Sequence, residues 1–92
     1  MTDDATVQLI VRLPGGNTID DVDLRYRIED AIEEGLPDGC LSRLAGGSSD
    51  GMMEVCADLQ AHGWERALTG VRSVLMEANK WDRASVLRAG AP

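Results

Sequence analysis

The side chains with the greatest capacity for chemistry are the carboxylates gathered between residues 20 and 38. Paired carboxylates can act as a general acid and base, and a dense set of them attracts a basic partner. Residues 1–46 hold ten acidic and four basic residues, a net charge of −6, whereas residues 47–92 carry only −1. Exposed pairing with arginines one helical turn away accounts for part of this cluster, but not for the asymmetry. We therefore expect a surface that steers a basic protein, formed by Asp20, Asp23, Arg27, Asp30, Glu33 and Glu34.

Nucleophilic or metal chemistry would need the two cysteines, Cys40 and Cys56, or the single histidine, His62. The cysteines form no CxxC pair and no zinc-ligand spacing. His62 begins a predicted helix, several residues beyond the middle of the strand that holds Cys56, so that a nucleophile–base pair between them is geometrically awkward. A simple hairpin register, with Ala45 opposite Met52, places the two cysteines on opposite faces of a sheet. The sequence predicts no catalytic residues, no metal and no cofactor, and an enzyme that uses Cys56 ranks last among the hypotheses.

Two glycine-rich segments have the composition of phosphate-binding loops. The first, Pro14–Asn17, leads from a strand into a helix, where backbone N–H groups often bind anions. The carboxylates that follow, Asp20, Asp21 and Asp23, already occupy the positive end of the helix dipole and repel an anion. The second, Gly46–Gly51, connects two strands and is interpreted as a hairpin tip. Both segments are predicted to be turns rather than ligand sites.

Composition excludes several classes of protein. The 92 residues, 43% hydrophobic and 27% charged, predict one soluble globular domain over residues 1–92. A net charge of −7 is repelled by nucleic acids and by anionic membranes. No apolar stretch approaches the ~20 residues that span a bilayer, and no signal peptide is recognised. With only two cysteines as well, the expected location is the cytoplasm.

Hydropathy changes its period along the chain. Strands alternate apolar and polar residues, and helices repeat them at about 3.6 residues. We expect Thr18 to cap the first helix, Gly35 to end it in the left-handed conformation, Gly70 to mark a close contact of the second helix with the sheet, and Asn79 to form its left-handed cap. The predicted strands span 5–13, 40–45, 52–59 and 84–89, and the predicted helices span 18–35 and 62–79.

This order, β-α-β-β-α-β, has two crossovers that are each preferentially right-handed. They place both helices on one face of a four-stranded antiparallel sheet, the ferredoxin-like arrangement of an α+β protein. The first and third strands then lie in the centre. The second and fourth are short edges that carry Arg43 and Arg88, as expected of edges that resist aggregation.

The face of this sheet opposite the helices is a second candidate surface. Aromatic residues make up only 3% of the chain and none lies on a predicted strand, which argues against RNA binding at this face. Three residues, Ile10, Met52 and Cys56, supply apolar anchors, so that either a homodimer interface or a small-ligand site is compatible with the pattern. The open face is predicted to comprise Gln8, Ile10, Arg12, Arg43, Met52, Glu54, Cys56 and Asp58.

Three segments, Ile28–Ile32, Gly51–Val55 and Ala67–Leu75, resemble those of short uncharacterised bacterial proteins of ferredoxin-like fold. The resemblance implies the same fold and carries no catalytic motif. In build the chain is also similar to immunity proteins, which neutralise bacterial toxins, and Pro14-Gly15 resembles amino-acid-binding regulatory domains of the ACT type. The glycine-and-arginine loop of acylphosphatases is absent.

Together these patterns favour a non-enzymatic protein-interaction domain, of the immunity or adaptor type, that presents its acidic first helix to a basic toxin or enzyme. The alternative is a small-ligand-binding regulatory module that dimerises through its open sheet face.

Overall fold

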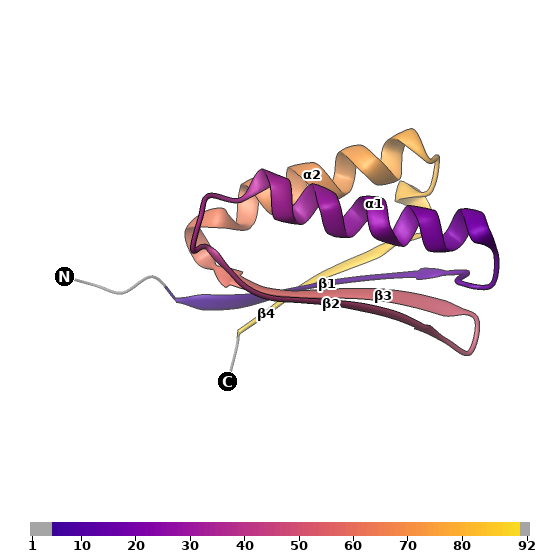
Figure 1. Cartoon of the computed structure of the whole chain (residues 1–92), viewed down its shortest axis with the longest axis horizontal. Coiled ribbons are helices and arrows are strands. Elements are labelled where there is room, and N and C mark those ends of the chain that lie inside the picture. The colour runs from indigo at the N-terminus through magenta and orange to yellow at the C-terminus, as the bar shows by residue number, and fades with distance from the viewer. Residues whose placement is uncertain (1–4, 91–92) are drawn as a thin grey trace.

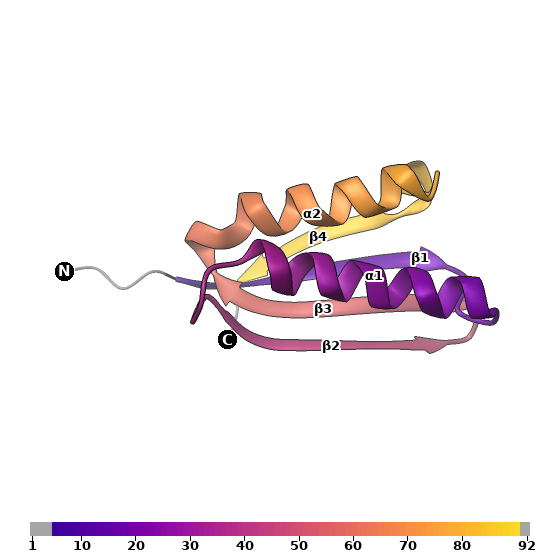
Figure 2. The ribbon, with the colours of Figure 1, turned by 45° about the horizontal axis from the view of Figure 1, so that its top comes forward.

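A computed structural model describes residues 5–90. One sheet is covered on a single face by two helices (Figure 1, Figure 2). The strand order is β2-β3-β1-β4 and every neighbouring pair is antiparallel, which confirms the predicted ferredoxin-like fold. The elements are β1 (Thr6–Pro14), α1 (Ile19–Gly35), β2 (Leu41–Ser49), β3 (Met52–Gln60), the 3₁₀ turn η1 (Ala61–Gly63), α2 (Trp64–Glu77), the 3₁₀ turn η2 (Trp81–Arg83) and β4 (Ser85–Gly90).

The core lies between the two central strands and the helices. Alternate residues of β1 and β3 point toward the helices and are buried, because their apolar side chains recur with the period of two that a strand requires. Each helix contributes one buried stripe at helical spacing. The buried residues of the strands are Val7, Leu9, Val11 and Leu13 of β1 with Met53, Val55, Ala57 and Leu59 of β3, and those of the helices are Leu24, Ile28, Ile32, Ala67, Val71 and Leu75.

Helix α1 begins as predicted but ends differently. The Thr18 hydroxyl accepts a hydrogen bond of 3.1 Å from the backbone N–H of Asp21, which confirms Thr18 as the N-cap. The prediction that Gly35 forms a left-handed cap is wrong, since Gly35 is the last helical residue and Leu36 follows in an extended conformation. A residue before proline is driven out of the helical region, and Pro37 imposes this on Leu36.

Strand β2 is longer than predicted. Residues 46–49 belong to the strand, and only Asp50 and Gly51 form the turn, with φ angles of 54° and 77°. Two residues of positive φ make the tight hairpin turn that Asp-Gly favours. Ser49 therefore pairs with Met52 and Ala45 pairs with Cys56, so the predicted pairing of Ala45 with Met52 is wrong.

An irregularity near the start of β2 sets which side chains face the helices. Leu41 pairs with Leu59 but Arg43 pairs with Asp58, so that β2 advances two residues while β3 advances one. This is the count of a β-bulge. As a result Leu41 and Leu44, three residues apart, both pack against the core, while Arg43 lies on the opposite face.

Helix α2 starts two residues later than predicted, after η1, and ends at Glu77. Asn79 has a φ of 60°, which confirms its left-handed cap. Gly70 does not face the sheet as expected. A Cβ on Gly70 would lie 3.0 Å from the carbonyl oxygen of Ala31, so the residue marks the contact between the two helices. Among the described residues, neither helix has both the length and the apolar character needed to cross a bilayer.

Candidate functional site

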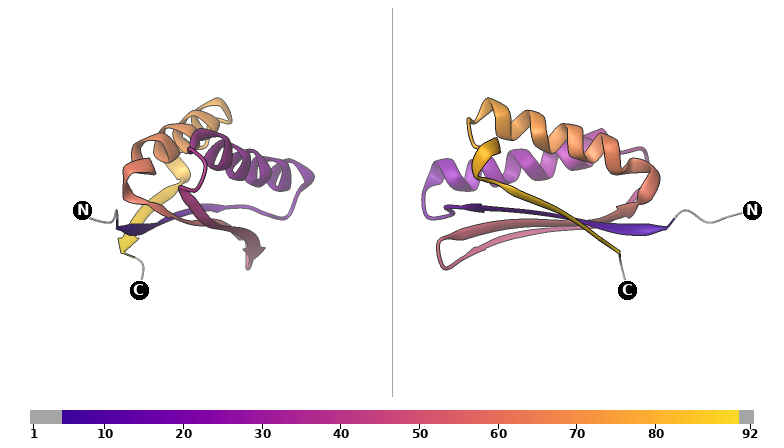
Figure 3. Two further views of the ribbon diagram at one scale, coloured as in Figure 1. Left: turned by 60° about the vertical axis from the view of Figure 1, so that its left-hand side comes forward. Right: turned by 180° about the vertical axis from the view of Figure 1, so that it is seen from behind.

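The face of the sheet away from the helices is not covered by any described element (Figure 3). The strand registers align its side chains in rows that run across all four strands. We name the central one the apolar row. It consists, from β2 to β4, of Ala45, Cys56, Ile10 and Leu87.

Two polar rows flank the apolar row. The Arg12 row consists of Gly47, Glu54, Arg12 and Ser85, and the Gln8 row of Arg43, Asp58, Gln8 and Ala89. In each row the residues of the two central strands contact one another. Arg12 pairs with Glu54, and the side-chain amide of Gln8 donates to Asp58 Oδ1 at 3.3 Å. The open face is thus an apolar band between two hydrogen-bonded polar bands.

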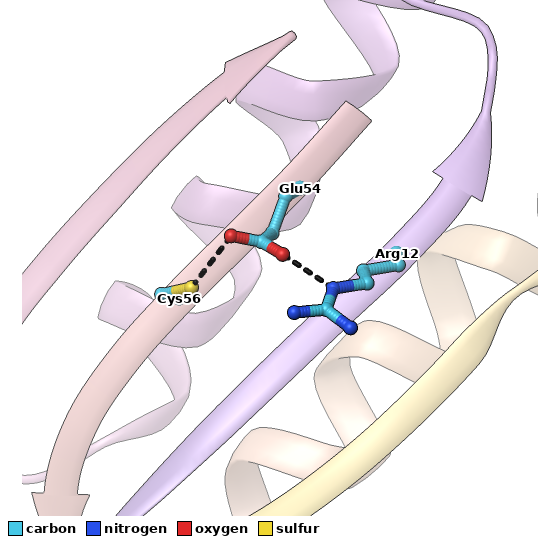
Figure 4. A network of polar contacts seen from close by, with 3 residues as sticks. All are labelled: Arg12, Glu54 and Cys56. Carbon is cyan, nitrogen blue, oxygen red and sulfur yellow. Dashed lines mark hydrogen bonds and ion pairs between the residues drawn. The ribbon is translucent and has the colours of Figure 1, made fainter. Parts of the chain in front are cut away.

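Three side chains of this face form a continuous network (Figure 4). Arg12 Nε donates to Glu54 Oε2 in an ion pair, and the Cys56 thiol donates to Glu54 Oε1 at 3.3 Å. The hydrogen bond from Arg12 is the largest cause that lowers the pKa of Glu54, and its counterpart raises the pKa of Arg12. Both charges are therefore held in place on an otherwise exposed surface.

The pKa of the Cys56 thiol is raised in this network, whereas the pKa of Glu54 is lowered. Partial burial is the first cause that raises the pKa of its thiol, and the hydrogen bond to Glu54 and the negative charge of Glu54 add to it. Arg12 and Arg43 oppose this shift to a smaller extent. Reactive cysteines have a lowered pKa, so that the environment of Cys56 disfavours a thiolate nucleophile. Cys40, the other free cysteine, is buried in the core.

A hollow of about 580 Å³ lies beside β2 on this face. Its size is within the range of small-molecule sites. Charged walls come from Arg12, Arg43 and Glu54, an apolar wall comes from Met52, and backbone is accessible along Gly46–Ser49 because these residues have small side chains or none. Within residues 5–90 no ion pair engages Arg43. The hollow could therefore accept a small molecule with an anionic group and an apolar part.

The residues predicted for a basic partner lie on the outer side of α1, where all six are exposed. Arg27 Nη2 lies 3.7 Å from Glu77 Oε1 and so links α1 to α2. In the part of the chain that the structure describes, the five carboxylates form no ion pair. These are Asp20, Asp23, Asp30, Glu33 and Glu34.

Two features of α1 differ from the expected exposed, charged surface. The predicted pairing of an arginine with a carboxylate one turn away occurs between Arg25 and Glu29, where Arg25 Nη1 donates to Glu29 Oε2 at 3.0 Å, but the two side chains are largely buried and cover Gly46 of β2. The glycine is needed there because a Cβ would overlap both side chains. The second feature is the exposure of Ile19, which the sequence could have signalled by its helical spacing away from the buried stripe. Tyr26, expected to be half-exposed, is also exposed.

Residues 5–90 contain no group of three or more His, Cys, Asp or Glu side chains arranged to hold a metal ion.

No protein-family model and no curated protein sequence matches this chain. Solved structures do resemble it. A dimeric ferredoxin-like protein of unknown function from Thermobifida fusca is 16% identical, with a TM-score of 0.63 over 99% of this chain and 96% of the other. A mutant of SnoaB, a cofactor-independent oxygenase from Streptomyces nogalater, is 9% identical, with a TM-score of 0.64 over 96% and 92%.

A Bacteroides thetaiotaomicron protein of unknown function, described as a possible oxidoreductase, is 9% identical, with a TM-score of 0.60 over 94% and 95% of the two chains. At these identities the likeness establishes the fold and no activity. Since one similar structure is an oxygenase, this fold is compatible with catalysis as well as with binding.

Proposed function

We propose that this chain works as a homodimeric module that binds a small ligand between two open sheet faces. The observation that carries the proposal is the arrangement of the apolar row between two polar rows. A binding role is preferred to a catalytic one because the raised pKa of Cys56 works against the nucleophile that the site would otherwise offer.

The rows are complementary to a second copy of themselves. Consider a two-fold axis that runs along the strands, midway between β1 and β3. It exchanges β1 with β3 and β2 with β4. Arg12 of one copy then faces Glu54 of the other, and Ile10 faces Cys56. At the edges the large Leu87 faces the small Ala45. Charge and size thus match across the interface.

The same two-fold axis would enclose the hollow beside β2 between the two copies. It lays β4 of the second copy over β2 of the first, so that a site open in one chain becomes enclosed in the dimer. Arg43 would bind an anionic group of the ligand and Met52 an apolar part. Small carboxylates with an apolar portion, amino acids among them, have this chemistry. The description of one similar structure as dimeric also supports the proposal.

The first experiment is the solution mass from light scattering and sedimentation. We expect a dimer at micromolar concentrations. Leu87→Glu should convert it to a monomer, because Leu87 is 45% exposed and lies in the apolar row. Met76→Glu is the matched control, since Met76 is 56% exposed but lies on α2. A monomeric wild-type chain, or equal behaviour of the two variants, would contradict the proposed interface.

The second experiment tests the ligand. A thermal-shift screen with amino acids and other small carboxylates should raise the melting temperature of the wild type, and Arg43→Ala should remove the shift. Arg66→Ala, on the exposed side of α2, should retain it. A shift that survives in Arg43→Ala would place the ligand elsewhere.

Recognition of a basic protein through α1 is a second candidate function. The observation that favours it is the set of five exposed carboxylates on one helix that form no ion pair with any residue between 5 and 90. Such binding should weaken with added salt and with charge reversal at Asp20, Asp30 and Glu34. Binding indifferent to these changes would exclude α1 as the recognition surface.

A further inference from the structure

Helix α1 carries apolar side chains on two opposite sides. Leu24, Ile28 and Ile32 form the buried stripe. On the solvent side, Ile19 is 88% exposed and Tyr26 is 52% exposed. A large apolar side chain left in water lacks the stabilisation that burial of its apolar surface would give. Two of them on one helix face, beside a hollow, mark a surface that is unpartnered in the single chain.

The exposed apolar residues of α1 and two of its carboxylates lie along one line on the helix surface. At 3.6 residues per turn, Ile19, Val22 and Tyr26 lie on the same outer side of the helix as Asp30 and Glu33. We name these five residues the outer ridge. Its first half is apolar and its second half is acidic. With a rise of 1.5 Å per residue, the fourteen steps from Ile19 to Glu33 give the ridge a length of about 21 Å.

The apolar half of the outer ridge already borders a hollow in the single chain. A hollow of about 460 Å³ is lined there by Ile19, Val22 and Tyr26 together with Gly16–Thr18 and Asp23. The guanidinium of Arg25 lies 4.8 Å from the centre of the Tyr26 ring, and Arg25 is itself bonded to Glu29. A tyrosine that is already positioned loses less entropy on binding, and tyrosine is enriched among the residues that dominate interfaces.

We propose that the outer ridge binds an amphipathic, basic helical segment of another protein. The segment would place apolar side chains at helical spacing against Ile19, Val22 and Tyr26, and lysines or arginines about two turns further on against Asp30 and Glu33. The length of the ridge fits a helix of about four turns, and anchors spaced by three or four residues are typical of helix recognition.

Charge excludes the other occupants. A second copy of the ridge, laid antiparallel, would press its acidic half onto the apolar half of the first. Laid parallel, it would oppose carboxylate to carboxylate. An anionic membrane would be repelled by the same residues. The inference rests on the second candidate function, recognition through α1, and is independent of the proposed dimer, which uses the other side of the molecule.

The test uses a synthetic peptide of about 16 residues, whose leucines at helical spacing occupy its first half and whose lysines occupy its second. A peptide of the same composition in scrambled order is the control. Titration followed by ¹⁵N–¹H NMR should perturb amides of α1 on its outer side. We expect the patterned peptide to bind at least about tenfold more tightly than the scrambled one, the change that one interface anchor typically produces.

Variants separate the two halves of the ridge. Tyr26→Ser and Ile19→Ser should each raise the Kd of the patterned peptide by about tenfold. Met76→Ser, an exposed apolar residue on α2, should leave it unchanged. Asp30→Lys combined with Glu33→Lys should raise the Kd and reduce its dependence on salt. Circular dichroism should report unchanged folding, because all the replaced side chains are exposed.

The outcomes are distinguishable. If the charge reversals weaken binding but Tyr26→Ser and Ile19→Ser do not, α1 recognises basic partners by charge alone, and the inference fails while the second candidate function survives. If none of the variants weakens binding, both fail. Equal binding of the patterned and scrambled peptides, or perturbation centred on the sheet, would also overturn the inference.

Discussion

Gly70 of α2 lies directly against the backbone carbonyl of Ala31 of α1. An added Cβ at Gly70 would be 3.0 Å from that oxygen and 3.4 Å from the Ala31 Cβ. The absence of a side chain at this position therefore allows the two helices to approach one another closely, while each still covers the sheet. Glycine lowers the intrinsic stability of the helix, and at this position it permits the close contact between the two helices.

The first prediction follows from this contact. Gly70→Ala gains about 1 kcal/mol in helix propensity but forces a backbone carbonyl to move, so that we expect a net loss of about 1–2 kcal/mol in the free energy of unfolding. Gly35→Ala is the matched control, because its Cβ would meet the Arg66 carbonyl oxygen at an ordinary 3.5 Å. Urea denaturation should show it neutral or slightly stabilising. A more stable Gly70→Ala variant would contradict the tight contact.

The second prediction concerns the thiol of Cys56. Glu54→Gln removes a negative charge and should lower the pKa of Cys56 toward its ordinary value, whereas Arg12→Gln removes a positive charge and should raise that pKa further. Thiolate absorbance at 240 nm, measured against pH with Cys56→Ser as the baseline, follows both. Shifts of the same sign in the two variants would exclude the network as the cause.

The third prediction is a dependence of stability on pH at the start of α1. Asp21 Oδ2 accepts a 3.0 Å hydrogen bond from the Gly16 N–H, the largest cause that lowers the pKa of Asp21, and contacts with Thr18 and Asn17 add to it. A lowered pKa in the folded state means that the carboxylate stabilises the fold above its unfolded pKa, and that this contribution is lost as the pH falls through the folded pKa.

Asp21→Asn should therefore be less stable than the wild type at pH 7, and the difference should shrink as the pH falls through the folded pKa of Asp21 and vanish below it. Thermal melts across this range provide the measurement, and an NMR titration of the carboxyl carbon gives the pKa itself. A constant difference in stability from pH 7 to pH 2 would show that the side chain acts by shape rather than by charge.

The fourth prediction compares two isoleucines of one helix. Ile28→Ala should destabilise the protein by about 2–5 kcal/mol, because the side chain is fully buried and its removal leaves a cavity. Ile19→Ala should change stability by less than about 0.5 kcal/mol, because its side chain lies in water. Equal losses in chemical denaturation would mean that Ile19 packs within the single chain, which would remove the apolar half of the outer ridge.

The sequence was informative where apolar residues recur without interruption. In β1 and β3 every second residue from Val7 to Leu13 and from Met53 to Leu59 is apolar, so that strand, face and central position all followed from the pattern. Alternation along β1 and β3 also indicated which of their side chains point away from the helices. It did not indicate the β2 and β4 members of the rows, because the bulge sets the face of the β2 side chains. Their use in binding is a prediction that the experiments above address.

What the sequence could not provide was the register. Residues 46–49 have little preference for a strand, and they are extended because β3 supplies hydrogen-bonding partners. The alignment of Cys56 with Ala45, and hence the rows, depends on a two-residue turn and on a bulge near Ser42 that neither composition nor period marks. On α1, the exposure of Ile19 was not predicted, although its helical spacing places it away from the buried stripe.

The Asp50-Gly51 turn has a consequence for how this protein can diverge. Side chains alternate between the faces of a strand, so that one residue inserted near the hairpin tip, if the turn keeps its two-residue length, would swap every β2 partner of β3 from one side to the other. Arg43 would turn toward the helices and Leu44 toward water. Descendants of this sequence that lengthen the hairpin are expected to do so by even numbers of residues, or to compensate at the bulge, and the parity of such changes among homologues would record whether selection preserves the open face.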